Sequence, residues 1–134
     1  MKKIFLPLLL SLMFVITACG GGGGASTTID VTFTDFTFTP AEFTIPAGQV
    51  ITLNSKNEGA VLHEFVIMNL GQTIGDDFGD EDEGNIYWEV ETDAGKSGTT
   101  TFTAPTEPGV YQVVCGTEGH FVAGMVGKLT VVAP

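Results

Sequence analysis

Apolar and polar residues alternate along most of the chain after Thr28, and this period of two restricts the possible folds more than any other feature. Ile29, Val31 and Phe33 alternate with polar residues, as in a strand with one buried face. Further short segments favour strands at 43–45, 50–53, 62–67, 99–103, 110–115 and 128–132. Turn residues such as the Pro108–Gly109 pair separate them. We therefore predict an all-β protein.

Seven or eight short strands with turn signals between them predict a Greek-key β-sandwich. Two places interrupt the pattern. At Asp35 the phase of the alternation slips by one residue, so that Phe36 and Phe38 take the apolar positions, and such a slip indicates a bulge or a bend. The segment from Thr73 to Asp93 is ambiguous, and we expect a long loop or a short helix there.

The first nineteen residues are typical of an export signal. Lys2 and Lys3 precede an apolar run over 4–16, which is short for a permanent membrane span. The run ends in Ile-Thr-Ala-Cys at 16–19, which resembles the bacterial lipoprotein cleavage box. On that resemblance, residues 1–18 are the signal peptide, Cys19 is lipidated, 19–27 is a glycine-rich tether and 28–134 is the folded domain. The alternative is an ordinary signal peptide that happens to contain Cys19.

The charge of the chain excludes one class of partner. Sixteen acidic residues stand against five basic ones, for a formal net charge of -11. Nucleic acid is therefore not expected to bind, because phosphate recognition needs a basic surface. The densest acidic run, Asp76 to Glu83, is interpreted first as a solvated loop. A docking patch for a basic partner such as a cytochrome, and a calcium site, are the other interpretations.

The chain has only two cysteines and two histidines, which excludes a disulfide-rich scaffold and a zinc cluster of four Cys and His ligands. Cys115, His120 and Met125 lie between the last two predicted strands. A thiolate, an imidazole and a thioether are three of the ligand types of a mononuclear blue-copper site. His63 supplies the fourth, because it shares a strand face with Phe65 and is the one remaining histidine. We therefore predict one copper ion per chain, held by His63, Cys115, His120 and Met125.

The spacing Cys-x4-His-x4-Met resembles that of cupredoxins of the azurin and auracyanin type. The resemblance extends from about Ile29 to Val132 and includes 45–49, the Asn57-x-Gly59 turn, 108–111 and 124–127. It implies that Cys115, His63 and His120 are strong ligands and that Met125 is a weak axial one. It also implies one-electron transfer through Cu(I) and Cu(II). The sequence departs from the family at Glu64, where azurins and plastocyanins usually have an asparagine that helps to hold the cysteine loop.

From these features we expect an electron carrier, lipid-anchored on the outer side of a bacterial cell membrane or outer membrane. Its partners are expected to be redox proteins, such as a basic cytochrome or a membrane electron-transfer complex. Phe121, Val122 and Ala123 flank His120 and would form a small uncharged surface through which electrons pass. A second function stays open, namely copper resistance, storage or delivery, since the strand His-Glu-Phe-Val-Ile at 63–67 is reminiscent of copper-handling proteins.

An enzyme is not expected. Copper oxidases and nitrite reductases need further histidines for their catalytic copper, and both histidines of this chain already belong to one site. A thiol enzyme that paired Cys115 with His120 as its base would leave His63 and Met125 unexplained.

Overall fold

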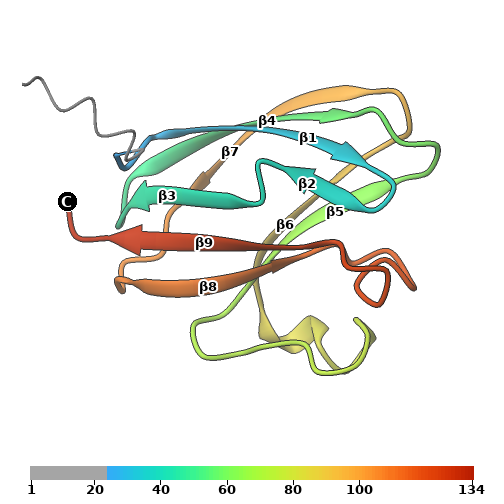
Figure 1. Ribbon diagram of the computed structural model, residues 1–134. Coiled ribbons are helices and arrows are strands. Elements are labelled where there is room, and N and C mark those ends of the chain that lie inside the picture. Colours follow the sequence, from blue (N-terminus) through green and yellow to red (C-terminus); the bar gives the residue numbers. More distant parts are fainter. Residues whose placement is uncertain (1–23) are drawn as a thin grey trace, which may run out of the picture.

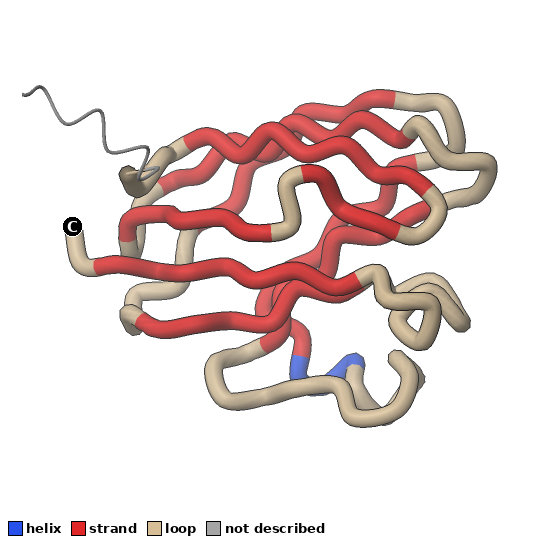
Figure 2. Tube along the Cα trace, in the orientation of Figure 1, coloured by secondary structure: helices blue, strands red, loops and turns tan. Residues whose placement is uncertain are grey.

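The computed structural model describes residues 24–134 and arranges them as two facing β-sheets (Figure 1). The predicted signal peptide and Cys19 lie outside the described residues. Strands and loops make up nearly all of the domain (Figure 2). The strands are β1 (Thr28–Thr34), β2 (Thr37–Thr39), β3 (Glu42–Pro46), β4 (Val50–Asn57), β5 (His63–Met68), β6 (Ile86–Thr92), β7 (Ser97–Thr103), β8 (Gly109–Val114) and β9 (Val126–Val132). The predicted all-β sandwich is confirmed.

The first sheet has the strand order β2-β1-β4-β7 and the second has the order β3-β9-β8-β5-β6. Both are mixed, because β1 pairs with β4 in parallel and β3 pairs with β9 in parallel, whereas the other pairs are antiparallel. Strands that follow each other in sequence often lie in different sheets. The β1–β2, β4–β5 and β8–β9 connections meet at one end of the sandwich, at the right of Figure 1.

The core between the sheets is rich in aromatic rings. Phe65 on β5 lies at its centre and is fully buried. Its ring contacts those of Phe33, Phe38 and Phe43, with centroid separations of 5.4 to 6.4 Å. Both hydrophobic clusters are built from residues between Ile29 and Val131, so the described domain has a complete core of its own. We therefore treat residues 24–134 as a unit that folds independently.

The phase slip at Asp35 is a hairpin turn. β1 and β2 pair in antiparallel fashion, with Thr34 opposite Thr37, and Asp35 and Phe36 form the turn between them. Phe38 is buried on the same core as Phe33, whereas Phe36 remains 40% exposed at the end of the sandwich. The slip thus separates two short strands and leaves the two turn residues projecting from the end where the connections meet.

The expectation of a loop or short helix between Thr73 and Asp93 was incomplete. Residues 73–82 form a loop and the short 3₁₀ helix η1 (Glu83–Asn85) follows it, as expected, but residues 86–92 form β6, a ninth strand. β6 is an edge strand in which Ile86, Trp88 and Val90 are half-buried and the residues between them are exposed. This alternation could have predicted the strand from the sequence. The two glutamates on the exposed face hid it, because glutamate is depleted in strands.

The segment that precedes β6 covers the outer face of β5 and β8. Ile74 and Phe78 pack there with Val66, Met68 and Val114 in a second hydrophobic cluster. The backbone N–H of Ile74 also donates to Gln112 Oε1 at 2.7 Å. The acidic segment is therefore anchored by apolar residues on one side, while Asp76, Asp80, Glu81 and Glu83 are exposed. No helix among residues 24–134 is long and apolar enough to cross a membrane.

Candidate metal centre

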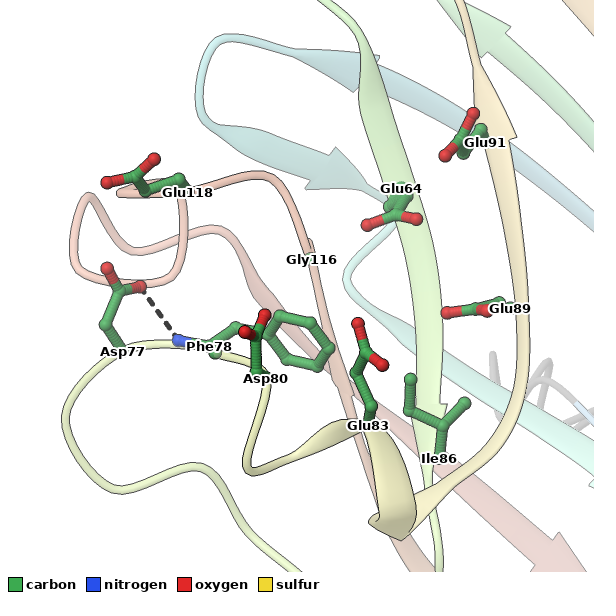
Figure 3. A pocket seen from close by; sticks show the side chains of 11 residues that line it. Glu64, Asp77, Phe78, Asp80, Glu83, Ile86, Glu89, Glu91, Gly116 and Glu118 are labelled. Carbon is green, nitrogen blue, oxygen red and sulfur yellow. Dashed lines mark hydrogen bonds between the residues drawn. The ribbon is translucent and has the colours of Figure 1, made fainter.

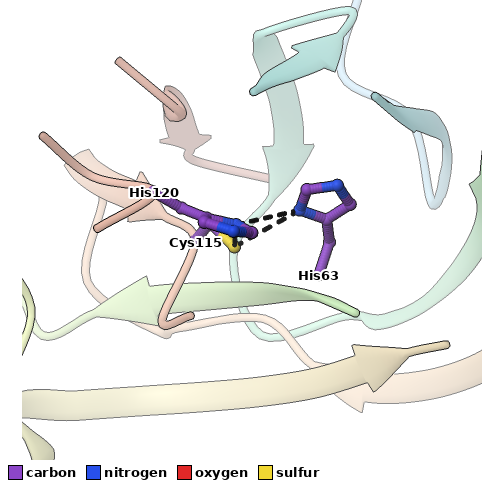
Figure 4. Close-up of side chains that lie close together, drawn as sticks. All are labelled: His63, Cys115 and His120. Atoms are coloured by element: carbon purple, nitrogen blue, oxygen red, sulfur yellow. Dashed lines mark hydrogen bonds between the residues drawn. The ribbon is translucent and has the colours of Figure 1, made fainter. Parts of the chain in front are cut away.

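Three buried side chains converge where the β4–β5 and β8–β9 connections meet (Figure 4). His63 begins β5, Cys115 follows β8, and His120 lies in the loop before β9. His63 Nδ1 and His120 Nδ1 are 3.1 Å apart, and Cys115 Sγ lies 3.3 Å from His120 Nδ1 and 3.8 Å from His63 Nδ1. Within residues 24–134 this is the one cluster of His, Cys and carboxylate side chains close enough to share a metal ion.

The chemistry of this cluster fits a soft metal cation. The Nδ1 atoms of two imidazoles and a sulfur atom face one another in a site where His63 and Cys115 have no exposed surface. Such an arrangement is repulsive unless a proton or a cation lies between the donors, because no water is available to solvate them. Burial, followed by the proximity of His63, lowers the pKa of His120 below its ordinary value. His120 is thereby kept neutral, which is the form that binds metal.

The loop that carries His120 is shaped by two glycines. Gly119 precedes His120 with φ of 78°, and Gly124 precedes Met125 with φ of 98°. Both angles lie in the left-handed region, which glycine adopts without strain. The Met125 N–H donates to the His120 carbonyl at 3.0 Å, and the Cys115 N–H donates to the Met125 carbonyl at 3.1 Å. Met125 is fully buried in the main core, so the loop returns it to the same end of the sandwich as Cys115 and His120.

Glu64 does not support the cysteine loop in the way that an asparagine side chain would. Its backbone N–H donates to Cys115 Sγ at 3.4 Å, so this contact is independent of the side chain. The Glu64 carboxylate points instead into an acidic groove. Burial, and then the charges of Glu89, Glu91 and Glu83, raise the pKa of this carboxyl group above its ordinary value. The loop is tied to the β4–β5 connection by Thr117, whose hydroxyl donates to the Leu62 carbonyl at 3.2 Å.

Two residues of the β1–β2 turn touch the histidines, and sequence reasoning did not identify either of them. Asp35 Oδ1 lies 2.8 Å from His63 Nε2. The ring of Phe36 packs edge-on against His120 with a centroid separation of 4.8 Å. The phase slip at Asp35 was the signal available in the sequence, but it gave no indication that the turn would reach the site.

The surface around His120 is apolar. His120 itself is 6% exposed, whereas Val122 is 68% exposed and Ala123 is exposed beside it. Phe121 is half-buried, because it packs on the second hydrophobic cluster. Phe36 and Val61, from the β1–β2 turn and the β4–β5 connection, add further exposed apolar area at this end of the sandwich.

An acidic groove of about 730 Å³ borders the cysteine loop at Gly116 (Figure 3). Its lining carries seven carboxylates and no basic side chain. These acidic residues come from β5, the acidic segment, β6 and the β8–β9 loop, and they are Glu64, Asp77, Asp80, Glu83, Glu89, Glu91 and Glu118. Among the described residues, these carboxylates do not converge into a metal-binding cluster, so the calcium interpretation gains no support.

Asn57, at the end of β4, fixes the connection that leads to His63. It is 1% exposed. Its Nδ2 donates to the carbonyls of Val61 and Thr92, each at 2.8 Å, and its Oδ1 accepts the N–H of Gly59 at 2.8 Å. One amide side chain thus joins β4, the β4–β5 connection and β6 directly beside the metal centre.

Comparison with known proteins gives a consistent result. A family model described as the cupredoxin-like domain matches residues 6–131. Auracyanin-B of Chloroflexus aurantiacus is 30% identical over 110 residues, which cover 70% of this chain and 46% of that protein. The copper-resistant cuproprotein CopI of Rubrivivax gelatinosus is 32% identical over 124 residues, covering 84% of this chain and 70% of that protein. The chain therefore spans less than half the length of the first of these relatives.

The fold is also similar to solved structures. The dithionite-reduced auracyanin of Roseiflexus castenholzii superposes with a TM-score of 0.68 at 34% identity. The match covers 81% of this chain and 99% of that one. The similarity therefore extends over most of this chain and nearly all of that one.

We predict that Asn57→Asp destabilises the metal-free domain by at least about 2 kcal/mol, because a carboxylate oxygen would face two buried carbonyl oxygens in place of a donor. Urea unfolding of residues 24–134 measures the effect. Gln49→Glu, the same change at an exposed position, is the matched control and should have little effect. Equal stability of the two variants would contradict the role assigned to Asn57.

Proposed function

This chain belongs to the cupredoxin-like domain family, and from that premise we propose that it is a one-electron carrier that holds a single type 1 copper ion outside the cytoplasm. The observation that carries the proposal is the convergence of His63 Nδ1, His120 Nδ1 and Cys115 Sγ in a buried site. These donor types suit copper in both oxidation states, and the buried thioether of Met125 favours copper over zinc. The copper ion, when bound, supplies a Cu(I)/Cu(II) couple.

The protein's own part in electron transfer is to hold the ligands still. His63 is fixed on β5. Cys115 is fixed by two hydrogen bonds: its backbone N–H donates to the Met125 carbonyl, and its Sγ accepts the backbone N–H of Glu64. A preorganised set of ligands needs little rearrangement when the charge of the site changes, which favours fast transfer. The chain acts here as a carrier and not as an enzyme, because its two histidines are used by this one site.

Electrons would enter and leave through the edge of His120. This imidazole is the ligand nearest to solvent, and the exposed side chains of Val122 and Ala123 lie beside it. An uncharged surface of this kind allows a partner to approach closely, since no charged group must lose its water. Phe121, beside His120, packs against the second hydrophobic cluster. The ring of Phe36 packs against His120 and adds apolar area to this surface.

A second function, copper resistance or delivery, is favoured by one observation. The relative from Rubrivivax gelatinosus is named a copper-resistant cuproprotein, and its identity to this chain is as high as that of auracyanin-B. A delivery protein must release its copper, whereas a carrier must retain it through each reduction. The burial of the three converging side chains favours retention.

The acidic groove supports a basic redox protein as the partner. Seven carboxylates without a basic side chain produce a strongly negative surface immediately beside the cysteine loop. Complementary charge accelerates encounter more than it raises affinity. We propose that such a partner, for example a basic cytochrome, is attracted by the groove and contacts the surface around His120.

For location, we propose that Cys19 anchors the domain to the outer face of a bacterial membrane. The support is the Ile-Thr-Ala-Cys box and the five glycines that follow it. The described domain starts its first strand at Thr28, which leaves a short glycine-rich linker between Cys19 and the fold.

The first test is copper binding and retention. Adding Cu(II) to residues 24–134 should produce an intense thiolate-to-copper charge-transfer band in the visible spectrum, and Cys115→Ser should abolish it. The band should return in full after repeated cycles of reduction and reoxidation, with a Cu(I) chelator present as competitor. Absence of the band in the wild-type domain would refute the copper site. A band that fades with each cycle in the presence of the chelator would favour delivery instead.

The groove is tested with two charge-matched double variants and a basic c-type cytochrome as probe. Asp80→Asn with Glu83→Gln should slow electron transfer to the cytochrome several-fold at low ionic strength and weaken its dependence on salt. Glu42→Gln with Glu107→Gln removes the same charge outside the groove and should have a smaller effect. Equal slowing by both pairs would mean that only the net charge matters.

The anchor is tested on the mature protein from a bacterial host. Mass spectrometry of the N-terminal peptide should show a lipid-modified Cys19, and Cys19→Ser should release the protein from the membrane fraction. An unmodified N-terminus produced by cleavage at another position would contradict the anchor without affecting the copper site.

A further inference from the structure

Asp35 is the one carboxylate that directly contacts a ligand of the metal centre in the described domain. It lies in the β1–β2 turn, 28 residues before His63, and its Oδ1 is 2.8 Å from His63 Nε2. The same carboxylate accepts the backbone N–H of Ala60, with N–O distances of 3.0 and 3.2 Å. These two bonds, that from Ala60 first, lower the pKa of Asp35 below its ordinary value.

The space for this contact depends on Gly59. A Cβ atom on Gly59 would overlap Asp35 Oδ1 and would lie 2.7 Å from His63 Nε2. Any side chain at this position would therefore occupy the space where the carboxylate meets the imidazole. Gly59 is in turn held by its N–H bond to Asn57. The contact between turn and ligand is thus built by three segments: the β1–β2 turn, the end of β4 and the start of β5.

We propose that Asp35 is a positioning residue that sets the tautomer of His63 and lowers the reduction potential of the centre. Its carboxylate accepts the proton of Nε2, so the lone pair of the neutral ring is on Nδ1, the atom that faces Cys115 and His120. Carboxylates that bind the far nitrogen of a metal-ligating histidine fix its orientation and raise its basicity. The part of the proposal that concerns potential rests on the proposed function; the part that concerns the tautomer does not.

The sign of the effect on potential follows from two contributions. A more basic imidazole binds Cu(II) more strongly than Cu(I), because the ion of higher charge gains more from a better donor. A negative charge beside the ligand also stabilises the more positive oxidation state. Both lower the potential, so removing the carboxylate must raise it.

A simpler role for Asp35 is to hold the β4–β5 connection through Ala60 alone. That role predicts a loss of stability but no change in the ring proton of His63 and no consistent shift in potential. The two roles are therefore separable by measurements on the ring and on the redox couple.

The first measurement uses metal-free, ¹⁵N-labelled residues 24–134 at neutral pH. Long-range ¹H–¹⁵N correlation of the histidine rings should show His63 with its proton on Nε2, and that proton should exchange slowly with water. In Asp35→Ala the proton should exchange faster and the two tautomers should mix. A proton on Nδ1 in the wild-type domain, or an unchanged ring in Asp35→Ala, would overturn the proposal. This result does not depend on copper.

The second measurement is the reduction potential of the copper-loaded domain. At a fixed applied potential, Asp35→Ala should decrease the ratio of oxidised to reduced sites by about tenfold, a positive shift of about 59 mV for a one-electron couple. Copper affinity should fall by at least about tenfold, as for other outer partners of histidine ligands. Asp35→Asn keeps an acceptor oxygen and should shift in the same direction by less. Asp35→Asn can replace Asp35→Ala in this measurement if Asp35→Ala does not fold.

Two controls separate positioning from charge. Glu107→Gln removes one negative charge from the β7–β8 connection and should leave the potential unchanged, because that connection lies at the opposite end of the sandwich (Figure 1). Gly59→Ala changes no charge but displaces the carboxylate, so it should reproduce the rise in potential, whereas Gly75→Ala, at a glycine with open space around it, should not. Potentials of Asp35→Asn and Gly59→Ala equal to that of the wild type would show that Asp35 only anchors the connection.

Discussion

The domain depends on three electron-pair donors being held against one another in a place that water does not reach. Without a proton or a cation between them, His63 Nδ1, His120 Nδ1 and Cys115 Sγ would repel one another. What keeps them together is the packing of two sheets around Phe65 and the hydrogen bonds that join the connections at one end. The fold thereby keeps the three donor atoms close together, where a cation can take the place of the protons between them.

Each support for this contact comes from a different part of the chain. Asn57 holds the connection before His63, Thr117 ties the cysteine loop to that connection, and the backbone N–H of Glu64 reaches the sulfur. Asp35 arrives from the first hairpin. The surface around His120 and the acidic groove lie next to this assembly, so the fold places a route for electrons and a charged surface on the same end of the molecule.

Sequence reasoning predicted the parts of the site that depend on local spacing. Cys115, His120 and Met125 lie within eleven residues, and the face of β5 that carries His63 follows from the alternation with Phe65 and Ile67. The all-β sandwich followed from the same alternation. Asp35 and Gly59 were not predicted, because their roles arise from contacts between segments far apart in sequence. β6 was missed because its exposed glutamates resemble a solvated loop, although the partly buried residues between them follow the strand period.

The most direct test of a preformed site is to determine the structure of residues 24–134 without metal and again with copper bound. If the fold alone holds the ligands, the Cα atoms of His63, Cys115 and His120 should differ by less than about 1 Å between the two structures, as in other preorganised binding sites. The β8–β9 loop should also keep its hydrogen bonds in the metal-free domain. A metal-free domain in which this loop opens and the two imidazoles separate would contradict the account, because copper and not the sandwich would then be assembling the site.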